Sequence, residues 1–170
     1  MTTTQPHVHV LKMGGTIEFI DPAYDAINRQ MMKLDSSIEN YFQNLIKPHF
    51  DWSVEGIVEK DSREITDDDR ARLAGAIRAV PQTDILITHG TFTMGKTAHY
   101  LEQQYLTDKK IILTGSMIPT VGFAGSDAGF NLGFAIASFT SIEPGVYLSM
   151  NGGIFSAGEV AKNESLFRFE

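Results

Sequence analysis

The 170-residue sequence contains no cysteine, which excludes disulfide bonds, thiolate catalysis and cysteine-based zinc sites. It also lacks a cluster of basic residues, and its formal net charge is -7 at pH 7. Because nucleic-acid binding depends on lysine and arginine contacts with phosphates, we expect no nucleic-acid partner. No stretch approaches the roughly 20 apolar residues of a membrane helix, so we expect no membrane association. The first residues lack the cationic and apolar segments of a secretory signal, and we expect a cytoplasmic protein.

Several ligand-binding motifs are missing as well. No strand-like segment precedes a G-x-G-x-x-G or G-x-x-x-x-G-K-[ST] motif, which disfavours nucleotide binding. The five histidines include no H-x-x-x-H pair with a glutamate between them, which disfavours a zinc hydrolase. His7 and His9 lie near the chain start, where solvent exposure is more typical than metal binding, and His89 at a strand end fits a structural hydrogen bond as well as a catalytic role. We therefore expect no cofactor and no metal ion.

Strand-like and helix-like segments alternate along nearly the whole chain. The hydrophobic patterns predict strands over residues 8–13, 52–60, 84–90, 109–115 and 145–152, and helices over residues 36–46, 66–80, 93–106 and 126–139. This alternation predicts an α/β fold, a Rossmann-like or flavodoxin-like three-layer sandwich with a mostly parallel sheet. The length predicts a single domain over residues 1–170. Gly129 and Gly133, four residues apart on the last helix, predict close packing there.

The predicted strands end in short polar segments, namely MGGT, EKDS, THGT, LTGS and SMNGG. In a parallel α/β sheet, ligands bind at the carboxyl ends of the strands, where the chain leaves the sheet. Short Gly, Ser and Thr side chains leave hydroxyls and backbone N–H groups accessible there, so we expect a small polar ligand. Taken one at a time, Thr16, Ser62 and Lys162 also fit ordinary roles as a turn residue, a helix cap and a solvated surface charge.

Four of these segments together resemble one family. LKMGGTIEF resembles the T-G-G-T-I-A opening of the bacterial-type L-asparaginases, and ITHGTFTM resembles that family's H-G-T-D-T-M. LTGSMIPTVGFAGSDAGFNL is similar to the T-G-A-M-R-P segment and the A-D-G-P-x-N-L that follows it. SMNGGIFSAGEVAK resembles the M-N-D-x-x-x-x-G-x-x-V-x-K stretch. The segments occur in the family's order, and the resemblance runs from Val8 to about Lys162.

The resemblance implies an amidohydrolase that converts L-asparagine to L-aspartate and ammonia through a threonine nucleophile and an acyl-enzyme. Thr16 falls on the family's nucleophile, and Thr91 falls on its second catalytic threonine. Lys162 matches the lysine that works with the second threonine. Ser62 falls where the family places a serine that binds the substrate's α-carboxylate, and Tyr24 matches the tyrosine of the loop that closes over the site.

Amide hydrolysis has physical requirements that these residue types meet. An amide is a poor electrophile with a poor leaving group, so a covalent step, a base and donors for the oxyanion all lower the barrier. Threonine is a weak nucleophile until a base takes its proton, and a partly desolvated lysine acts as such a base in Ser-Lys hydrolases. The backbone N–H groups of Gly90, Thr91 and Ser116 are candidate oxyanion donors. The other candidate substrate-binding positions neighbour these residues or Thr16 and Ser62: Gly15, Asp61 and Phe92.

The length of the chain departs from the family pattern. Family members carry a second, smaller C-terminal domain, and the sequence resembles only their N-terminal catalytic domain. In the family's dimers, the neighbour's second domain contributes substrate-binding residues. We therefore expect the pocket either to be closed by another part of a neighbouring subunit or to stay more open. An apolar surface that would otherwise face a second domain favours self-association, so we expect a homo-oligomer, a dimer or higher.

Phe92 is the second departure, because it stands where the family has the aspartate of H-G-T-D-T. By the resemblance, that aspartate completes a Thr-Lys-Asp triad and binds the substrate's α-ammonium group, and a phenyl ring does neither. Three hypotheses follow. In the first, another carboxylate near the carboxyl ends of the strands binds the ammonium group, and the candidates are Asp61, Asp127 and Glu159. Alternatively, the substrate is a small carboxylate amide without an ammonium group, or the domain binds an amino acid or another small acid without turnover.

Overall fold

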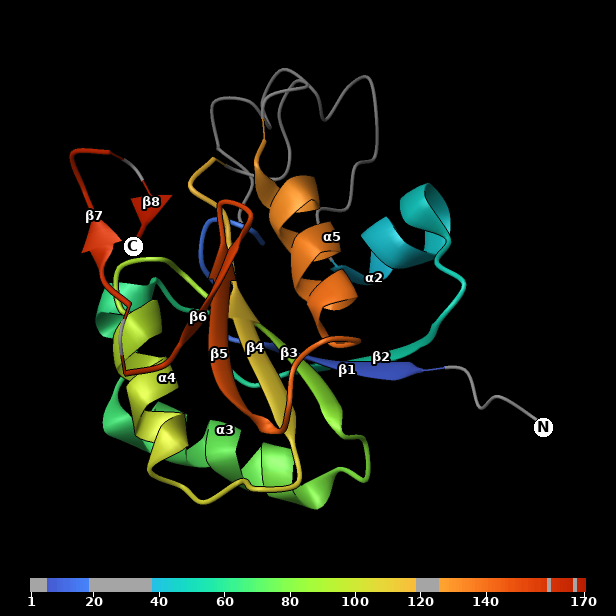
Figure 1. The fold of residues 1–170 in the computed structure, drawn as a ribbon, viewed down its shortest axis with the longest axis horizontal. Coiled ribbons are helices and arrows are strands. Elements are labelled where there is room, and N and C mark those ends of the chain that lie inside the picture. The colour runs from blue at the N-terminus through green and yellow to red at the C-terminus, as the bar shows by residue number, and fades with distance from the viewer. Residues whose placement is uncertain (1–5, 19–37, 119–125, 159, 167) are drawn as a thin grey trace.

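The computed structural model describes residues 6–18, 38–118, 126–158, 160–166 and 168–170. Its centre is a six-stranded sheet in the order β2-β1-β3-β4-β5-β6 (Figure 1). The strands are β1 (His7–Lys12), β2 (Asp51–Gly56), β3 (Asp84–Thr88), β4 (Lys110–Thr114), β5 (Gly145–Met150) and β6 (Gly153–Ser156). The first five are parallel, and β6 runs antiparallel to β5. The order of the parallel strands is that of a flavodoxin-like doubly wound sheet, which confirms the predicted α/β architecture.

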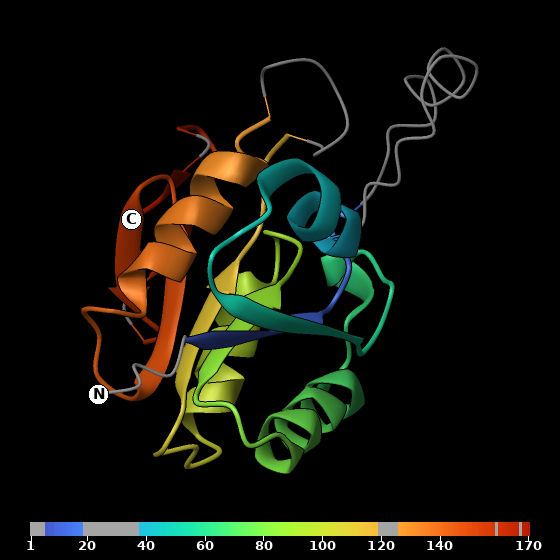
Figure 2. The ribbon, with the colours of Figure 1, turned by 90° about the vertical axis from the view of Figure 1, so that its right-hand side faces the viewer.

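Helices cover both faces of this sheet (Figures 1 and 2). One face carries α3 (Asp67–Ala79) and α4 (Met94–Glu102), and the other carries α2 (Ile38–Asn40), a π-helix (Tyr41–Ile46) that continues it, and α5 (Ala128–Ser138). Side chains along β3 alternate between the two cores. Ile85 and Ile87 belong to the core under α3 and α4, whereas Leu86 belongs to the core under α5. All three are fully buried, as expected for a central strand of a parallel sheet.

Helix α3 begins at the N-cap that the sequence predicts. Thr66 Oγ1 accepts a hydrogen bond from the backbone N–H of Asp69 at 3.2 Å, and Asp69 Oδ2 accepts one from the backbone N–H of Thr66 at 2.9 Å. This capping box satisfies donors that helix geometry would otherwise leave unpaired. Lys60 Nζ donates to Asp69 Oδ2 at 2.7 Å, and this ion pair lowers the pKa of the Asp69 carboxyl to about 2. The start of α3 is therefore tied to the segment that precedes Ser62.

Three predicted element boundaries were wrong. The strand predicted over residues 52–60 ends at Gly56, and the chain then turns toward a short 3-10 turn at Ser62–Glu64. The helix predicted over residues 93–106 ends at Glu102, and it does not continue to residue 106, because Tyr105 has a φ of 54°, which a right-handed helix does not accommodate. In the segment predicted as one helix over residues 36–46, the described residues form α2 and then the π-helix.

The predicted exposure of the first two histidines was wrong for His9, which is only 6% exposed. Ser53 Oγ on β2 lies 2.8 Å from His7 Nε2 and 2.7 Å from His9 Nδ1. Burial lowers the pKa of His9, which keeps its imidazole neutral at pH 7. The two histidines therefore join β1 to β2 through a shared hydroxyl.

Three strands were not predicted from the sequence. β6 follows β5 through a turn in which Asn151 and Gly152 have φ angles of 56° and 76°. β7 (Lys162–Asn163) and β8 (Arg168–Phe169) form a separate antiparallel pair. Phe169 anchors this pair, since it is 4% exposed and belongs to the core under α3 and α4. β7 and β8 contain only two residues each, which is too short for a periodic pattern, so sequence periodicity does not reveal these two strands.

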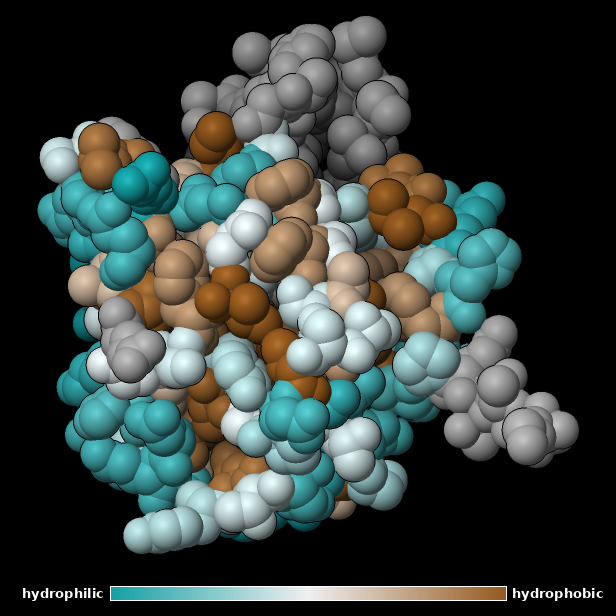
Figure 3. All heavy atoms as spheres, in the orientation of Figure 1, coloured by the Kyte–Doolittle hydropathy of each residue, from teal (hydrophilic) through white to brown (hydrophobic). Residues whose placement is uncertain are grey.

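The face that carries α5 is partly apolar (Figure 3). Exposed apolar side chains on the π-helix and α5 include Leu45, Ile46 and Phe130. Of the two glycines predicted to pack closely, Gly129 does so, since a Cβ there would lie 2.9 Å from the Tyr41 hydroxyl, whereas a Cβ at Gly133 would meet nothing within 4 Å. Among the described helices, none combines the length and hydrophobicity needed to cross a bilayer.

The turn after β1 depends on two glycines. Gly14 and Gly15 have φ angles of 78° and 94°, a region that other residues rarely adopt. A Cβ at Gly15 would lie 2.4 Å from Gly90 Cα, and a Cβ at Gly14 would lie 2.6 Å from the Lys60 carbonyl oxygen. The absence of side chains therefore lets the turn after β1 touch the turn after β3.

We expect Gly15→Ala to lower the free energy of unfolding by about 2 kcal/mol or more, because the new Cβ has a disfavoured φ and overlaps Gly90. Gly133→Ala is the matched control. It adds the same methyl group to a helix where nothing obstructs it, and it should raise stability by about 0.5–1 kcal/mol. Urea unfolding of the two variants and the parent measures both effects. Equal stability of the Gly15→Ala variant and the parent would contradict the close contact.

Candidate active site

The carboxyl ends of β1, β3 and β4 lie side by side, because Lys12 pairs with Thr88 and Thr88 pairs with Thr114 in the sheet. The next described helix after β1 packs on the α5 face, whereas the helix after β3 packs on the opposite face. In doubly wound sheets, ligands bind in the crevice where the connections diverge in this way. Thr16 follows β1 and Thr91 follows β3. The two threonines predicted to act in catalysis therefore lie where the connections diverge.

A close contact joins Ser62 to the turn after β3. A Cβ at Gly90 would lie 2.7 Å from both Cβ and Oγ of Ser62, which is 2% exposed. The 3-10 turn that Ser62 begins is capped by Asp61, whose Oδ1 accepts a hydrogen bond from the backbone N–H of Arg63 at 2.9 Å. The alternative interpretation of Ser62 as a helix cap was therefore wrong. Gly90 therefore packs against both Ser62 and Gly15, and all three were predicted as binding positions.

Thr91 and Lys162 are in direct contact. Lys162 Nζ donates a hydrogen bond to Thr91 Oγ1 at 3.0 Å, although 71 positions separate the two residues in the sequence. Thr91 is 7% exposed, and Lys162 on β7 is half-buried. A buried hydroxyl beside an amine is the arrangement in which the amine, once neutral, takes up the hydroxyl proton.

The His89 side chain hydrogen-bonds the peptide group between Gly90 and Thr91. The Gly90 carbonyl accepts a hydrogen bond from His89 Nδ1 at 2.7 Å, so the imidazole carries its proton on Nδ1. Arg70 Nε donates to Thr97 Oγ1 at 3.0 Å, and the Thr97 hydroxyl donates to His89 Nε2 at 2.8 Å. His89 is fully buried, and burial lowers its pKa to about 4. The predicted structural hydrogen bond of His89 is confirmed.

Phe92 faces two cations. Lys162 Nζ lies 4.1 Å from the ring centroid and Arg63 Cζ lies 4.8 Å from it, while the side chain stays 54% exposed. Cation–π contacts of this kind contribute about 0.5–1 kcal/mol at exposed sites. Arg63 Nε and Nη2 also donate to the two carboxylate oxygens of Asp61, both at 2.9 Å. These hydrogen bonds lower the pKa of Asp61 to about 2, so the carboxylate is charged and occupied by Arg63.

Asp127, a candidate for binding an ammonium group, has a structural role. Its carboxylate accepts hydrogen bonds from the backbone N–H groups of Met117 and Ile118 at 3.0–3.1 Å. It therefore fixes the segment after β4, which includes Ser116. The Ser116 hydroxyl is buried, and none of the described residues hydrogen-bonds it.

Asn131 on α5 was missed by the sequence analysis. It is fully buried and donates from Nδ2 to the Gly115 carbonyl and to Asp127 Oδ2, both at 3.0 Å. Its Oδ1 accepts a hydrogen bond from the backbone N–H of Asn151 at 3.0 Å. The available signal was an amide in an otherwise apolar helix, because a buried amide requires partners. Asn131 therefore connects the ends of β4 and β5.

Glu18, two positions after Thr16, was also missed. Thr88 Oγ1 at the end of β3 donates a hydrogen bond to Glu18 Oε1, and burial raises the pKa of the Glu18 carboxyl. Two predicted site residues, Tyr24 and Glu159, lie outside the described residues. Within the part of the chain that the structure describes, no group of three or more His, Asp or Glu side chains is arranged to hold a metal ion.

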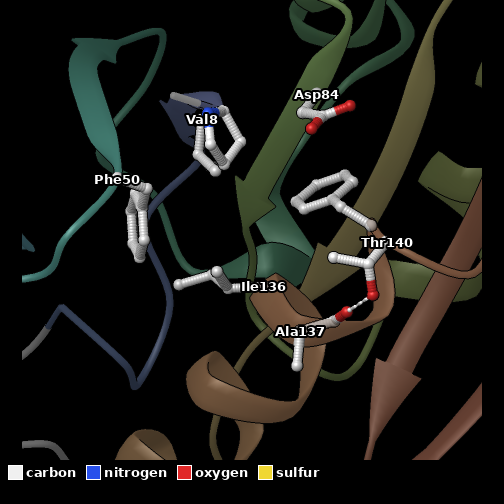
Figure 4. A pocket seen from close by; sticks show the side chains of 8 residues that line it. Val8, Phe50, Asp84, Ile136, Ala137 and Thr140 are labelled. Atoms are coloured by element: carbon white, nitrogen blue, oxygen red, sulfur yellow. Dashed lines mark hydrogen bonds between the residues drawn. The ribbon is translucent and has the colours of Figure 1, made fainter. Parts of the chain in front are cut away.

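Two cavities of about 360 and 350 Å³ lie away from these residues. Apolar side chains such as Phe50 and Ile136 line the larger one, together with the carboxylate of Asp84 (Figure 4). Val8, which also lines it, pairs with Asp84 at the amino ends of β1 and β3. This cavity is therefore at the end of the sheet opposite to Thr91. The second lies between α5 and the π-helix, and neither is lined by a predicted site residue.

We expect the free energy of unfolding to fall as the pH drops from about 6.5 toward 4. In this window the unfolded state takes up a proton at His89, whose ordinary pKa is 6.5, whereas the folded state, with a pKa of about 4, does not. The contribution of His89 to this loss is on the order of 3 kcal/mol at pH 4. Urea unfolding at about pH 7, 5.5 and 4.5 measures it.

His89→Asn is the control for this pH dependence, because its amide keeps a donor for the Gly90 carbonyl but does not titrate. The variant should show a shallower decrease in stability over the same pH range. Parallel pH curves for the variant and the parent would contradict a buried neutral His89.

Three comparisons relate the chain to known proteins. A sequence profile of the family described as "Asparaginase, N-terminal" matches residues 7–168. The chain is 31% identical to a probable periplasmic L-asparaginase of Haemophilus influenzae, over 94% of this chain and 47% of the relative. The crystal structure of a probable cytoplasmic L-asparaginase from Campylobacter jejuni has a TM-score of 0.76 and 30% identity, covering 98% of this chain and 51% of that one. The thermostable L-asparaginase from Thermococcus kodakarensis has a TM-score of 0.78 and 26% identity, covering 96% and 50%.

The chain spans about half the length of these relatives. Two of them are named for different compartments, the periplasm and the cytoplasm, so a cytoplasmic location stays a prediction. The profile match covers nearly the whole sequence, including every turn that brings Thr16, Ser62, Thr91 and Lys162 to the carboxyl edge of the sheet. The chain belongs to the asparaginase family and corresponds to the part described as its N-terminal domain.

Proposed function

We propose that this chain carries the catalytic residues of an amidohydrolase that releases ammonia from the side-chain amide of L-asparagine and leaves L-aspartate. The 3.0 Å contact between Lys162 Nζ and Thr91 Oγ1 carries the proposal. It pairs a hydroxyl with a base beside the crevice where a doubly wound sheet binds its ligand. Membership of the asparaginase family supports the reaction class.

The proposed reaction proceeds through an ester on Thr16. Thr16 Oγ1 attacks the amide carbon and forms a tetrahedral intermediate. The proton that Thr16 loses moves to the departing nitrogen, so ammonia leaves and an acyl-enzyme remains. Water, activated by the Thr91–Lys162 pair, then attacks the ester, releases L-aspartate and restores the Thr16 hydroxyl. The covalent step divides one difficult hydrolysis into two easier steps.

In this proposal the backbone N–H groups of Gly90, Thr91 and Ser116 stabilise the oxyanion. The carbonyls of the neighbouring peptides already have partners, because His89 donates to the Gly90 carbonyl and Asn131 donates to the Gly115 carbonyl. Donors that are fixed before the substrate arrives stabilise the transition state without a reorganisation cost. In this proposal the hydrogen bonds from His89 and Asn131 therefore favour catalysis as well as folding.

The site offers the two charged groups of asparagine unequal partners. Ser62 is the proposed contact for the α-carboxylate, because it packs on Gly90, next to Thr91. The α-ammonium requires a carboxylate. Asp61 is a candidate, because it directly precedes Ser62 in the sequence. Both Asp61 oxygens contact Arg63, whose side chain is 66% exposed. Exposed ion pairs are weak, typically below about 1 kcal/mol, so in this proposal the ammonium displaces Arg63 from Asp61.

We also propose that the protein acts as a homo-oligomer. Apolar side chains, among them Leu45, Ile46 and Phe130, are exposed on the α5 face. A second copy would cover this apolar surface and bring further residues toward the rim.

Phe92 favours a second candidate substrate, a small carboxylate amide without an ammonium group. Lys162 and Arg63 both face the ring, so a cationic substrate group placed beside Phe92 would meet positive charge. A neutral methylene in the same place would contact the exposed ring favourably. Succinamic acid has this chemistry, because it is asparagine without its α-ammonium group.

Lys162→Met should lower kcat for ammonia release from L-asparagine about 10²- to 10⁴-fold, because the substitution removes the proposed base and keeps the apolar part of the side chain. Lys96→Met is the matched control, since Lys96 lies on α4 with its side chain 66% exposed and should leave kcat unchanged. Equal kcat values for the two variants would refute the role of Lys162.

Thr16→Ala should abolish turnover and prevent accumulation of an acyl-enzyme, because it removes the proposed nucleophile. Thr107→Ala, at an exposed position after α4, is the control and should retain activity. Ammonia release and the mass of the denatured enzyme during turnover are the two measurements. Full activity of the Thr16→Ala variant would sink the nucleophile assignment.

The ratio of kcat/KM for succinamate to kcat/KM for L-asparagine distinguishes the two candidate substrates. A ratio above one supports the second candidate, and a ratio below one supports asparagine. Phe92→Asp should shift the ratio toward asparagine by about 10-fold or more, because the new carboxylate pairs with the ammonium. Phe92→Leu removes the ring without adding charge and serves as the control. Turnover of neither amide, together with thermal stabilisation by aspartate or succinate, would indicate a binding domain without catalysis.

A further inference from the structure

Lys162 lies on a strand that is too short to hold itself in place. β7 and β8 contain two residues each and pair in register, with Lys162 opposite Phe169. Two flanking backbone hydrogen bonds join Ala161 and Glu170, at 2.9 and 3.0 Å. An isolated two-stranded hairpin is marginal in water even when it is longer. The position of the lysine therefore depends on what fixes β8 to the rest of the protein.

Two contacts fix β8. The Phe169 ring is 4% exposed in the core under α3 and α4. The Phe169 backbone N–H donates to Asn151 Oδ1 at 3.2 Å. The buried ring holds β8 against the core. The hydrogen bond holds β8 next to the turn after β5. Since Phe169 pairs with Lys162, the same hydrogen bond constrains the start of the lysine side chain.

Asn151 is in turn fixed by the sheet and by α5. It has a φ of 56°, a left-handed conformation that asparagine tolerates better than most residues. Its backbone N–H donates to Asn131 Oδ1 at 3.0 Å, and Asn131 also donates to Asp127 Oδ2 and to the Gly115 carbonyl. Asn131 is fully buried, so these hydrogen bonds are shielded from competing water. A continuous series of contacts therefore runs from the end of β4 to β8.

We propose that Asn131 and Asn151 are positioning residues that set Lys162 Nζ against Thr91 Oγ1. Asn131 fixes the turn after β5 by its hydrogen bond with Asn151. Asn151 then fixes Phe169 through the Phe169 N–H, and Phe169 fixes Lys162 by strand pairing. The proposal rests on the proposed function, in which Lys162 acts with Thr91. Its physical basis is the sensitivity of proton transfer to distance, because displacing a group by about 1 Å reduces a rate by about 100-fold.

Variants at Asn151 test the proposal, because they change one acceptor and leave Lys162 and Thr91 intact. Asn151→Gly keeps the left-handed backbone and removes the acceptor for the Phe169 N–H. Asn151→Asp keeps an oxygen in the same place. The Gly variant should lower kcat for L-asparagine about 10- to 100-fold with KM within about 2-fold of the parent, whereas the Asp variant should recover most of that loss.

The position of Lys162 is measured separately from activity. In protein labelled with ¹³C-lysine, the ε-methylene resonance of Lys162 is assigned by its absence in Lys162→Arg. This resonance should shift in Asn151→Gly and return toward the parent position in Asn151→Asp, while the other lysine resonances stay in place. Asn151→Ala provides a second variant without the acceptor should the Gly variant not fold.

Two results would overturn the proposal. An unchanged Lys162 resonance with an unchanged kcat in the Gly variant would show that β8 holds its position without Asn151. Equal losses in the Gly and Asp variants, with parallel losses of thermal stability, would indicate a role in folding alone. If the parent hydrolyses none of the amides, the proposed function fails, and the lysine resonance still decides whether Asn151 positions Lys162.

Discussion

The backbone contact between Gly15 and Gly90 is the constraint on which the candidate site depends. A Cβ at Gly15 would lie 2.4 Å from Gly90 Cα, so the turns after β1 and β3 meet only because neither residue carries a side chain. Gly90 also accepts Ser62 at a distance that a Cβ would block. Three segments remote in sequence therefore converge, and Thr16 and Thr91 follow the contact directly. The two candidate catalytic threonines are therefore placed by backbone geometry.

Buried hydrogen bonds then hold this edge of the sheet in place. His89 holds the Gly90 carbonyl, and Asn131 holds the Gly115 carbonyl together with the turn at Asn151. Both side chains are fully buried, and a buried polar group is costly unless it is paired. The same requirement that stabilises the fold therefore orients the peptides that face the crevice. Arg70 extends the contacts of His89 through Thr97, and the Asp127 carboxylate extends those of Asn131, so charged groups complete both networks and help to preorganise the site.

Sequence reasoning was strongest where a pattern is local. The apolar runs predicted all five parallel strands, and the Thr66 cap was predicted because capping involves residues three positions apart. It failed for β7 and β8. Their pairing depends on the contact of Phe169 with the core, which is not visible in a periodic sequence pattern. The pairing of Thr91 with Lys162 came from the family resemblance, because nothing in the spacing of residues 71 positions apart predicts contact. The buried state of His9 was missed because its partner, Ser53, lies on another strand.

Phe92 alters the charge balance of the site as well as its shape. With an aspartate there, Lys162 would have an anion beside it, whereas here its ammonium faces a ring that a second cation, Arg63, also approaches. A cation–π contact compensates only part of a lost ion pair. Asp61 supplies a negative charge nearby, but both of its oxygens accept hydrogen bonds from Arg63. Lys162, which donates to the Thr91 hydroxyl, therefore faces an aromatic ring and a second cation. This arrangement disfavours an additional ammonium group beside Phe92, because it would meet two cations there.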